Sequence, residues 1–180
     1  MDHGDHVELL RGGVTGLGGT WADLGSGRGA FTLALADLLG AGSVIHSVDR
    51  DAGALRDQER AMRSRFPTAD VRYLLGDFTG PLDLPPLDGV VMANSLHFQR
   101  DRESVVRGVM GHLRPGGRLI VVEYDADRGS LWVPYPFSFR TWEALAARLG
   151  LRDVRLIGRM PSRVLGAIYS AVAKAPGDPI

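Results

Sequence analysis

Cysteine is absent from this chain of 180 residues, which excludes a disulfide framework and any metal site built on cysteine. Lysine is nearly absent: Lys174 is the only one among 21 basic residues, and the arginines are scattered rather than gathered in a stripe. The formal net charge is zero, so no overall field attracts nucleic acid or an anionic membrane. We therefore expect no nucleic-acid partner, no membrane partner and no metal site.

Long hydrophobic runs are also missing. The longest uninterrupted aliphatic run extends from Leu119 to Val122, whereas a membrane-spanning helix needs about 20 apolar residues. The polar stretch from Met1 to His6 lacks the apolar centre of a signal peptide. These features predict a cytoplasmic protein.

Glycine is plentiful, with 24 residues, and it is concentrated where the sequence is most informative. A short apolar run reaches Asp23, is followed by Gly25, Gly27 and Gly29, and leads into an apolar helical segment. Glycine permits a positive φ and lets a ligand approach the backbone closely. The first N–H groups of the helix are then free to face a ligand, so the stretch predicts a nucleotide-like binding site.

Three interpretations of this loop remain open at this point. Gly25, Gly27 and Ala30 satisfy the Gly-x-Gly-x-x-Gly/Ala pattern that binds a dinucleotide pyrophosphate. An acidic residue two positions before Gly-x-Gly-x-Gly, as Asp23 stands before Gly25, is instead typical of S-adenosylmethionine binding. The third interpretation is a glycine-rich turn without a ligand.

Strand-like and helical patterns alternate along most of the chain. After a short helix over 7–11, we expect strands over 20–24, 43–48, 71–75, 89–93 and 118–123, and helices over 30–39, 52–66 and 102–113. This alternation predicts a parallel sheet with helices on both faces.

The end of the chain has a different pattern. An irregular loop over 125–140 precedes a helix over 141–149, with Thr141 as its N-cap. Two strand-like runs, 154–159 and 167–173, are too close for an intervening helix and predict an antiparallel hairpin at the sheet edge. The fold class is therefore α/β, a Rossmann-like doubly wound sheet of about seven mostly parallel strands. We expect one domain over 20–174, an N-terminal helix and lead-in over 1–19, and a tail over 175–180.

Acidic residues follow the second and third predicted strands. Asp49 lies where a carboxylate can accept hydrogen bonds from both hydroxyls of a ribose. Asp77 and Phe78 offer an acceptor for an adenine amine and an apolar face for its ring. The simpler alternative is that both acids belong to solvated turns.

Taken in order, these motifs resemble those of the class I S-adenosylmethionine-dependent methyltransferase family. The resemblance rests on Asp23 to Gly29, Asp49, Gly76-Asp77-Phe78, the strand ending at Asn94, and Leu113-Arg114-Pro115-Gly116-Gly117, and it extends from about Leu10 to Val172. It implies S-adenosylmethionine as cofactor. Its methionine part would be held by Asp23, Gly25, Ser26, Gly27 and Gly29, its ribose by Asp49, its adenine by Asp77 and Phe78, with Asn94 near the sulfonium.

The chain departs from the family pattern at two places. Arg50 stands where many relatives have an apolar residue against adenine; its guanidinium can stack on the ring or point to solvent. The fourth strand ends in Asn94-Ser95-Leu96-His97, not in the Asn/Asp-Pro-Pro-Tyr/Phe signature of enzymes that methylate amide or adenine nitrogens. This ending is more similar to members acting on quinones and other small molecules, so we expect a small-molecule acceptor.

Two residues are candidate catalytic bases. His97 follows the fourth strand, near the expected position of the methyl group, and Glu123 ends the fifth strand. Each has a structural alternative: His97 can pack against cofactor or helix, and Glu123 can cap the next loop. Five aromatic residues between Trp132 and Trp142 are open to three interpretations, as an acceptor pocket, as core, or as a contact in a homodimer.

The favoured function is methyl transfer from S-adenosylmethionine. A non-catalytic S-adenosylmethionine-binding partner or sensor is the main alternative. A nicotinamide-dependent oxidoreductase is disfavoured because no chain remains for a substrate domain after the nucleotide-binding one.

Overall fold

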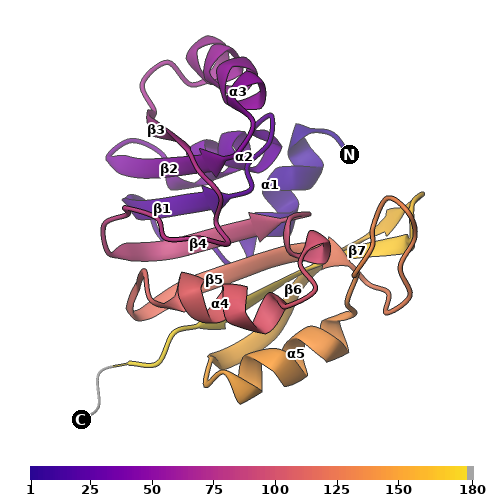
Figure 1. Ribbon diagram of the computed structural model, residues 1–180. Coiled ribbons are helices and arrows are strands. Elements are labelled where there is room, and N and C mark those ends of the chain that lie inside the picture. Colours follow the sequence, from indigo (N-terminus) through magenta and orange to yellow (C-terminus); the bar gives the residue numbers. More distant parts are fainter. Residues whose placement is uncertain (178–180) are drawn as a thin grey trace.

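A seven-stranded sheet forms the centre of the computed structural model, which describes residues 1–177 (Figure 1). The strands are β1 (Gly19–Leu24), β2 (Ser43–Asp49), β3 (Asp70–Leu75), β4 (Leu87–Ala93), β5 (Leu113–Tyr124), β6 (Arg152–Ser162) and β7 (Gly166–Lys174). Their order is β3-β2-β1-β4-β5-β7-β6. Strands β1 to β5 are parallel, whereas β7 is antiparallel to both β5 and β6. The predicted Rossmann-like sheet with a C-terminal antiparallel hairpin is confirmed.

Helices cover both faces of the sheet. They are α1 (His3–Arg11), α2 (Ala30–Leu39), α3 (Ala52–Arg65), α4 (Arg102–Met110) and α5 (Phe139–Arg148), with one 3-10 turn at Leu96–Phe98. The core on one face contains Leu10 of α1, Leu35 of α2 and Met62 of α3. The core on the other face contains Val106 of α4 and Trp142 of α5. The sheet thus separates two apolar cores, as its nearly continuous buried strands require.

Several predicted boundaries are wrong by a few residues. Helix α5 begins earlier than expected because Ser138, not Thr141, is the N-cap: the Ser138 hydroxyl accepts a 3.3 Å hydrogen bond from the Thr141 amide. Helix α4 ends at Met110 instead of residue 113. Leu113 already belongs to β5, where it pairs with Leu87 across an irregular register that accommodates the Arg-Pro-Gly-Gly stretch.

The aromatic segment divides between core and surface. Phe137 and Trp142 are fully buried between α5 and the sheet. Trp132 and Tyr135, in contrast, are 79% and 41% exposed. The core interpretation is therefore right for Phe137 and Trp142, and none of the segment lines the cavity described below.

The order of the strands determines where a ligand can bind. The chain starts in the middle of the sheet with β1, moves outward to β2 and β3, and then returns to β4 on the other side of β1. In open α/β sheets, such a switch point leaves a crevice at the carboxyl ends of the strands.

No helix within residues 1–177 is long and apolar enough to cross a bilayer. The predicted domain boundaries stay a prediction, and residues 178–180 of the predicted tail lie outside the described part.

Candidate cofactor site

The loop between β1 and α2 has the geometry that its glycines predict. Gly25, Gly27 and Gly29 all adopt positive φ, at +76°, +53° and +84°. A Cβ on Gly25 would lie 2.7 Å from the Ser95 Cβ and 3.0 Å from the Phe78 ring, so only glycine fits there. The Gly25 amide donates a 2.9 Å hydrogen bond to the carbonyl of Val48, which ties the loop to β2.

A glutamine that the sequence analysis missed supports this loop. Gln58 of α3 is fully buried, and its side-chain amide donates to the Ser26 hydroxyl and to the Gly27 carbonyl, both at 3.2 Å. A Cβ on Gly29 would lie only 2.1 Å from the Gln58 Cγ. Ser26 also accepts a 2.7 Å hydrogen bond from the Ser47 hydroxyl. The loop is therefore held from the α3 side before any ligand arrives.

Asp49 connects the end of β2 with the glycine loop. One oxygen of its carboxylate accepts a 2.7 Å hydrogen bond from the Gly27 amide, and the other accepts a 2.8 Å bond from the Asp51 amide. A carboxylate has about four lone-pair sites, so both oxygens can accept further hydrogen bonds. The two amides fix the carboxylate in an orientation from which it can receive a vicinal diol.

Asp77 lies at the neighbouring strand end, after β3. One of its oxygens accepts hydrogen bonds from the Thr79 amide and hydroxyl, at 2.9 and 2.7 Å. These bonds hold the pKa of Asp77 below its usual value, which keeps the group a carboxylate acceptor. The second oxygen remains available to an exocyclic amine, while Phe78 supplies an apolar ring at the same place.

These strand ends surround a cavity of about 510 Å³. It is lined by Gly25, Asp49, Arg50, Gly76, Asp77, Phe78, Thr79, Asn94, Ser95, Phe98 and Gln99. Asn94, one of the lining residues, adopts a positive φ of +52°. The Asn94 Oδ1 and Ser95 Oγ atoms are both buried and have no hydrogen-bond partner among the described residues.

The unpartnered atoms of Asn94 and Ser95 indicate whether S-adenosylmethionine fits the cavity. Buried polar atoms without partners are costly, and a ligand with amine and hydroxyl donors would satisfy them. The cavity also combines a carboxylate for the ribose, a carboxylate and ring for the adenine, and a glycine loop open to the ligand. Its size lies within the range of small-ligand sites, which is about 300–1,000 Å³. The residues present therefore fit the cofactor.

Six of the twelve predicted site residues line this cavity and the other six do not. The six that line it are Gly25, Asp49, Arg50, Asp77, Phe78 and Asn94. Ser26, Gly27 and Gly29 belong to the adjoining loop; Gln58 and Asp49 hold Ser26 and Gly27 by hydrogen bonds, and Gly29 packs against Gln58. Five lining residues were not predicted as site residues: Gly76, Thr79, Ser95, Phe98 and Gln99. A sequence does not reveal which residues of a turn face inward.

Asp23 lies beneath the loop instead of in the cavity wall. It is only 1% exposed, and its carboxylate accepts a 2.7 Å hydrogen bond from the Thr32 hydroxyl. Burial raises the pKa of Asp23 from 3.8 to about 7, despite the opposing effect of the Thr32 bond, and the nearby Asp49 charge adds to the rise. Its contacts are thus with the start of α2.

His97 and Glu123 form a buried pair behind the cavity wall. His97 Nδ1 lies 2.7 Å from Glu123 Oε2, and the side chains are 3% and 0% exposed. Glu123 Oε1 accepts hydrogen bonds from the backbone amides of Leu96 and His97, at 2.9 and 3.3 Å. Neither residue lines the cavity, but together they hold the turn that carries Phe98 and Gln99 into it. Their predicted role as bases stays a prediction.

The strand order, the glycine loop and the acidic strand ends define a nucleotide-binding α/β protein with the site at its switch point. The sequence profile of a family described as methyltransferase domain matches residues 22–119, which include the loop, Asp49, Asp77 and Asn94. The chain belongs to this family, the class I S-adenosylmethionine-dependent methyltransferases.

Curated relatives agree with this family. The chain is 29% identical over 181 residues to the arsenite methyltransferase of Aquipseudomonas alcaligenes, covering 87% of this chain and 50% of that protein. It is 26% identical over 104 residues to the ubiquinone/menaquinone biosynthesis C-methyltransferase of Idiomarina loihiensis, covering 57% and 41%. The chain thus spans half or less of the length of these relatives.

Solved structures show the same fold. The YcgJ protein of Bacillus subtilis superposes with a TM-score of 0.76 at 13% identity, covering 99% of this chain and 100% of that one. Phosphoethanolamine N-methyltransferase 2 of Haemonchus contortus, solved in complex with S-adenosyl-L-methionine, gives 0.74 at 16% identity and covers 97% and 52%.

Proposed function

We propose that the protein transfers a methyl group from S-adenosylmethionine to a small-molecule acceptor. The observation that carries this proposal is the cavity at the switch point, where Asp49 and Asp77 flank the buried, unpartnered atoms of Asn94 and Ser95. Family membership and the cofactor-bound neighbour of the same fold support it.

Different residues of the cavity bind different parts of the cofactor. Asp49 orients the ribose, Asp77 and Phe78 hold the adenine, and Gly25, which lines the cavity without a side chain, lets the methionine part approach the backbone closely. Arg50 lines the cavity beside Asp49, where its planar guanidinium can stack on the adenine. When bound, the cofactor supplies a methyl group activated by a positively charged sulfur.

The chain contributes to catalysis chiefly by positioning. Methyl transfer forms one bond to carbon and breaks the carbon–sulfur bond, whose electron pair stays on sulfur; an acceptor that carries a proton must also lose it. Alignment of two reactants can supply about 7–11 kcal/mol of the barrier. His97 and Glu123 hold the turn that carries Phe98 and Gln99. Because Phe98 and Gln99 line the cavity, the buried pair positions the acceptor through these two neighbours.

The acceptor is proposed to be small and partly apolar. A net charge of zero gives little phosphate neutralisation, which nucleic-acid binding requires. The arsenite methyltransferase and the ubiquinone/menaquinone biosynthesis C-methyltransferase among the relatives also take their names from small molecules. Incubation with methyl-labelled cofactor and panels of arsenite, quinones, phenols and short RNAs tests this. Label in a small molecule supports the proposal, and label only in RNA contradicts it.

One observation favours a second candidate, a cofactor-binding protein without catalysis. His97 and Glu123, the predicted bases, are buried and do not line the cavity. Tight binding of S-adenosylhomocysteine without turnover on any acceptor of the panel would support this candidate.

A further inference from the structure

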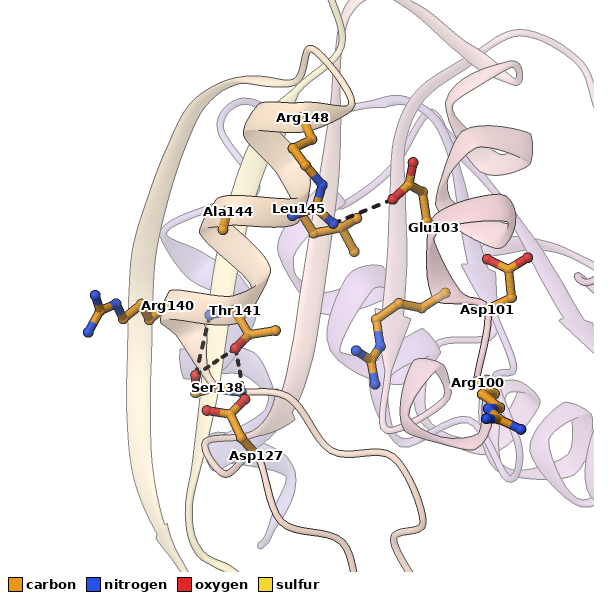
Figure 2. Close-up of a pocket in the computed structure, with 11 residues that line it drawn as sticks. Arg100, Asp101, Glu103, Asp127, Ser138, Arg140, Thr141, Ala144, Leu145 and Arg148 are labelled. Atoms are coloured by element: carbon orange, nitrogen blue, oxygen red, sulfur yellow. Dashed lines mark hydrogen bonds and ion pairs between the residues drawn. The ribbon is translucent and has the colours of Figure 1, made fainter.

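A second cleft lies between α4 and α5, apart from the cofactor cavity. Figure 2 shows the start of α4 facing one side of α5 across this space. The cleft has a volume of about 440 Å³ and shares no lining residue with the cofactor cavity. The backbone between them is continuous, because Phe98 and Gln99 line the first cavity and Arg100 and Asp101 line the second.

The carboxylates around this cleft already have protein partners. Asp101 caps α4 and accepts a 3.1 Å hydrogen bond from the Ser104 amide. Asp127 accepts bonds from the Ser138 amide and the Thr141 hydroxyl, at 2.9 and 2.8 Å (Figure 2). Because these acids are engaged by the helix starts, they are poor ligands for a cation, and the cleft's free hydrogen-bonding capacity lies in its arginines.

Arg102 is the arginine of this cleft whose Nε is buried without a partner. Its guanidinium carries five N–H bonds, and within residues 1–177 it has one recorded acceptor, the Tyr135 carbonyl at 2.8 Å. Its Nε is buried and has no partner there. The guanidinium stacks 4.6 Å above the centre of the Phe137 ring, which fixes its plane next to the cleft. A buried N–H without an acceptor is costly, so an anion that reaches the Nε of this half-buried side chain would be a favoured neighbour.

Two further unpartnered donors pack around the same ring. Trp142 and Tyr169 are fully buried, and their rings lie 6.3 and 6.4 Å from that of Phe137. Neither Trp142 Nε1 nor Tyr169 Oη has a hydrogen-bond partner among the described residues. These two donors lie in the core around the ring on which Arg102 stacks and do not line the cleft, so the groups that face an anion there are the arginines.

Arg148 supplies a second cation from the opposite wall. Its guanidinium reaches Glu103 at 3.4 Å (Figure 2). Glu103 also pairs with Arg107. The Arg148 side chain is 61% exposed, so its pair with Glu103 is weak and can be exchanged for a stronger partner.

We propose that the α4–α5 cleft binds an anionic small molecule through a carboxylate or phosphate group held by Arg102 and Arg148. A volume of about 440 Å³ exceeds what a bare ion requires and lies within the range of small-ligand sites. Planar guanidinium groups bind such oxyanions with two parallel hydrogen bonds. The site does not depend on methyl transfer, because the two cavities share no lining residue.

The test is a titration followed by nuclear magnetic resonance on the complete, ¹⁵N-labelled protein. Inorganic phosphate, acetate and phenyl phosphate are each added to about 20 mM at constant ionic strength, with sodium chloride as reference. We expect saturable shifts of the Arg102 Nε–H resonance for at least one anion and none for chloride. Tighter binding of phenyl phosphate than of inorganic phosphate identifies an organic molecule as the source of the anion; tighter binding of inorganic phosphate identifies the free ion and overturns the small-molecule proposal.

Variants separate this site from general charge effects. Arg102→Lys keeps the charge but loses the planar fork, and Arg148→Gln removes the second cation; binding, followed at the Trp142 indole resonance, should weaken about tenfold or more in the first. Arg140→Gln is the matched control, since Arg140 lines the same cleft but its side chain points away from it in Figure 2. Equal binding by Arg102→Lys and wild type, no saturable shift, or shifts confined to the Gly25–Gly29 amides would each overturn the proposal. Calorimetry with S-adenosylhomocysteine on the same samples keeps a failure here distinct from a failure of the cofactor site.

Discussion

The Gly27 amide donates a 2.7 Å hydrogen bond to the Asp49 carboxylate, joining the loop after β1 to the end of β2. This bond makes the ribose-binding acid and the glycine loop one unit. Because the Asp51 amide holds the other carboxylate oxygen at 2.8 Å, the acid is oriented before a ligand binds. Preorganisation of this kind reduces the entropy lost on binding.

Replacing Asp49 tests this unit directly. Asp49→Ala removes the ribose acceptor and frees the Gly27 amide, so affinity for S-adenosylhomocysteine should fall by ~2–4 kcal/mol. Isothermal titration calorimetry measures the change. Asp83→Ala is the control, because Asp83 is an exposed carboxylate outside the cavity. Equal affinity in Asp49→Ala and wild type would rule out the ribose assignment.

The glycine loop gives a second prediction. A Cβ on Gly27 would meet no protein atom within 4 Å, so the fold can accept it apart from the strain of a φ of +53°. Gly27→Val should therefore abolish S-adenosylhomocysteine binding while the protein remains folded by circular dichroism, because the side chain projects from the loop that adjoins the cofactor cavity.

Gly116 offers a matched control for this substitution. It also has a positive φ, of +73°, with no atom within 4 Å of a Cβ placed on it, but it lies near the start of β5, away from the carboxyl ends of the strands. Gly116→Val should carry a similar backbone strain and bind the ligand normally. Normal binding by Gly27→Val would show that the ligand does not approach this loop.

The buried Asp23 predicts a pH dependence of stability. Its pKa is raised from 3.8 to about 7 in the folded state, so between these values the folded protein binds more protons than the unfolded one. The free energy of unfolding should therefore decrease as the pH rises from about 4 to 7, by a few kcal/mol at most. Asp23→Asn should be more stable relative to wild type at pH 8 than at pH 5, as measured by urea unfolding.

Asp88→Asn serves as the contrast in that experiment. Although burial acts to raise it, the pKa of Asp88 is lowered by hydrogen bonds from the Thr20 amide and Arg114. The ionised Asp88 therefore stabilises the folded state fully at a pH above its ordinary pKa, and this stabilisation is lost only at lower pH. The difference between Asp88→Asn and wild type should stay constant from pH 5 to pH 8. The same constancy for Asp23→Asn would contradict the burial argument.

The His97–Glu123 pair gives a prediction that separates binding from turnover. Glu123→Gln should loosen the turn over 96–99 because it weakens three hydrogen bonds to Glu123. We expect turnover, once an acceptor is known, to fall about tenfold or more in both Glu123→Gln and His97→Ala. Affinity for S-adenosylhomocysteine should change much less. A larger loss of affinity than of turnover would assign the pair to cofactor binding instead.

The fold was predictable because its signals are local and repeated. Gly40 ends α2 at the expected residue, and the close spacing of the last two strands predicts their antiparallel pairing. The start of α5 was missed because Ser138 and Thr141 are both good caps, and only the bond between them decides. Propensity alone cannot choose between two capping residues three positions apart.

The site was predictable where a residue ends a strand and less so elsewhere. Asp49 and Asp77 follow from strand positions at the switch point. Gln58, which braces the loop from α3, lies 29 residues after Gly29 and has no motif that marks it. The burial of His97 and Glu123 depends on packing between β4, β5 and the segment after β5, which sequence spacing does not encode.

The central claim is that the cavity at the switch point binds S-adenosylmethionine, and calorimetry with two ligands tests it most directly. S-adenosylhomocysteine and NAD are titrated separately into the same preparation of wild-type protein. We predict saturable one-to-one binding of S-adenosylhomocysteine in the micromolar range, about −8 kcal/mol, and no measurable heat of binding for NAD. Binding of NAD with no binding of S-adenosylhomocysteine would contradict the account.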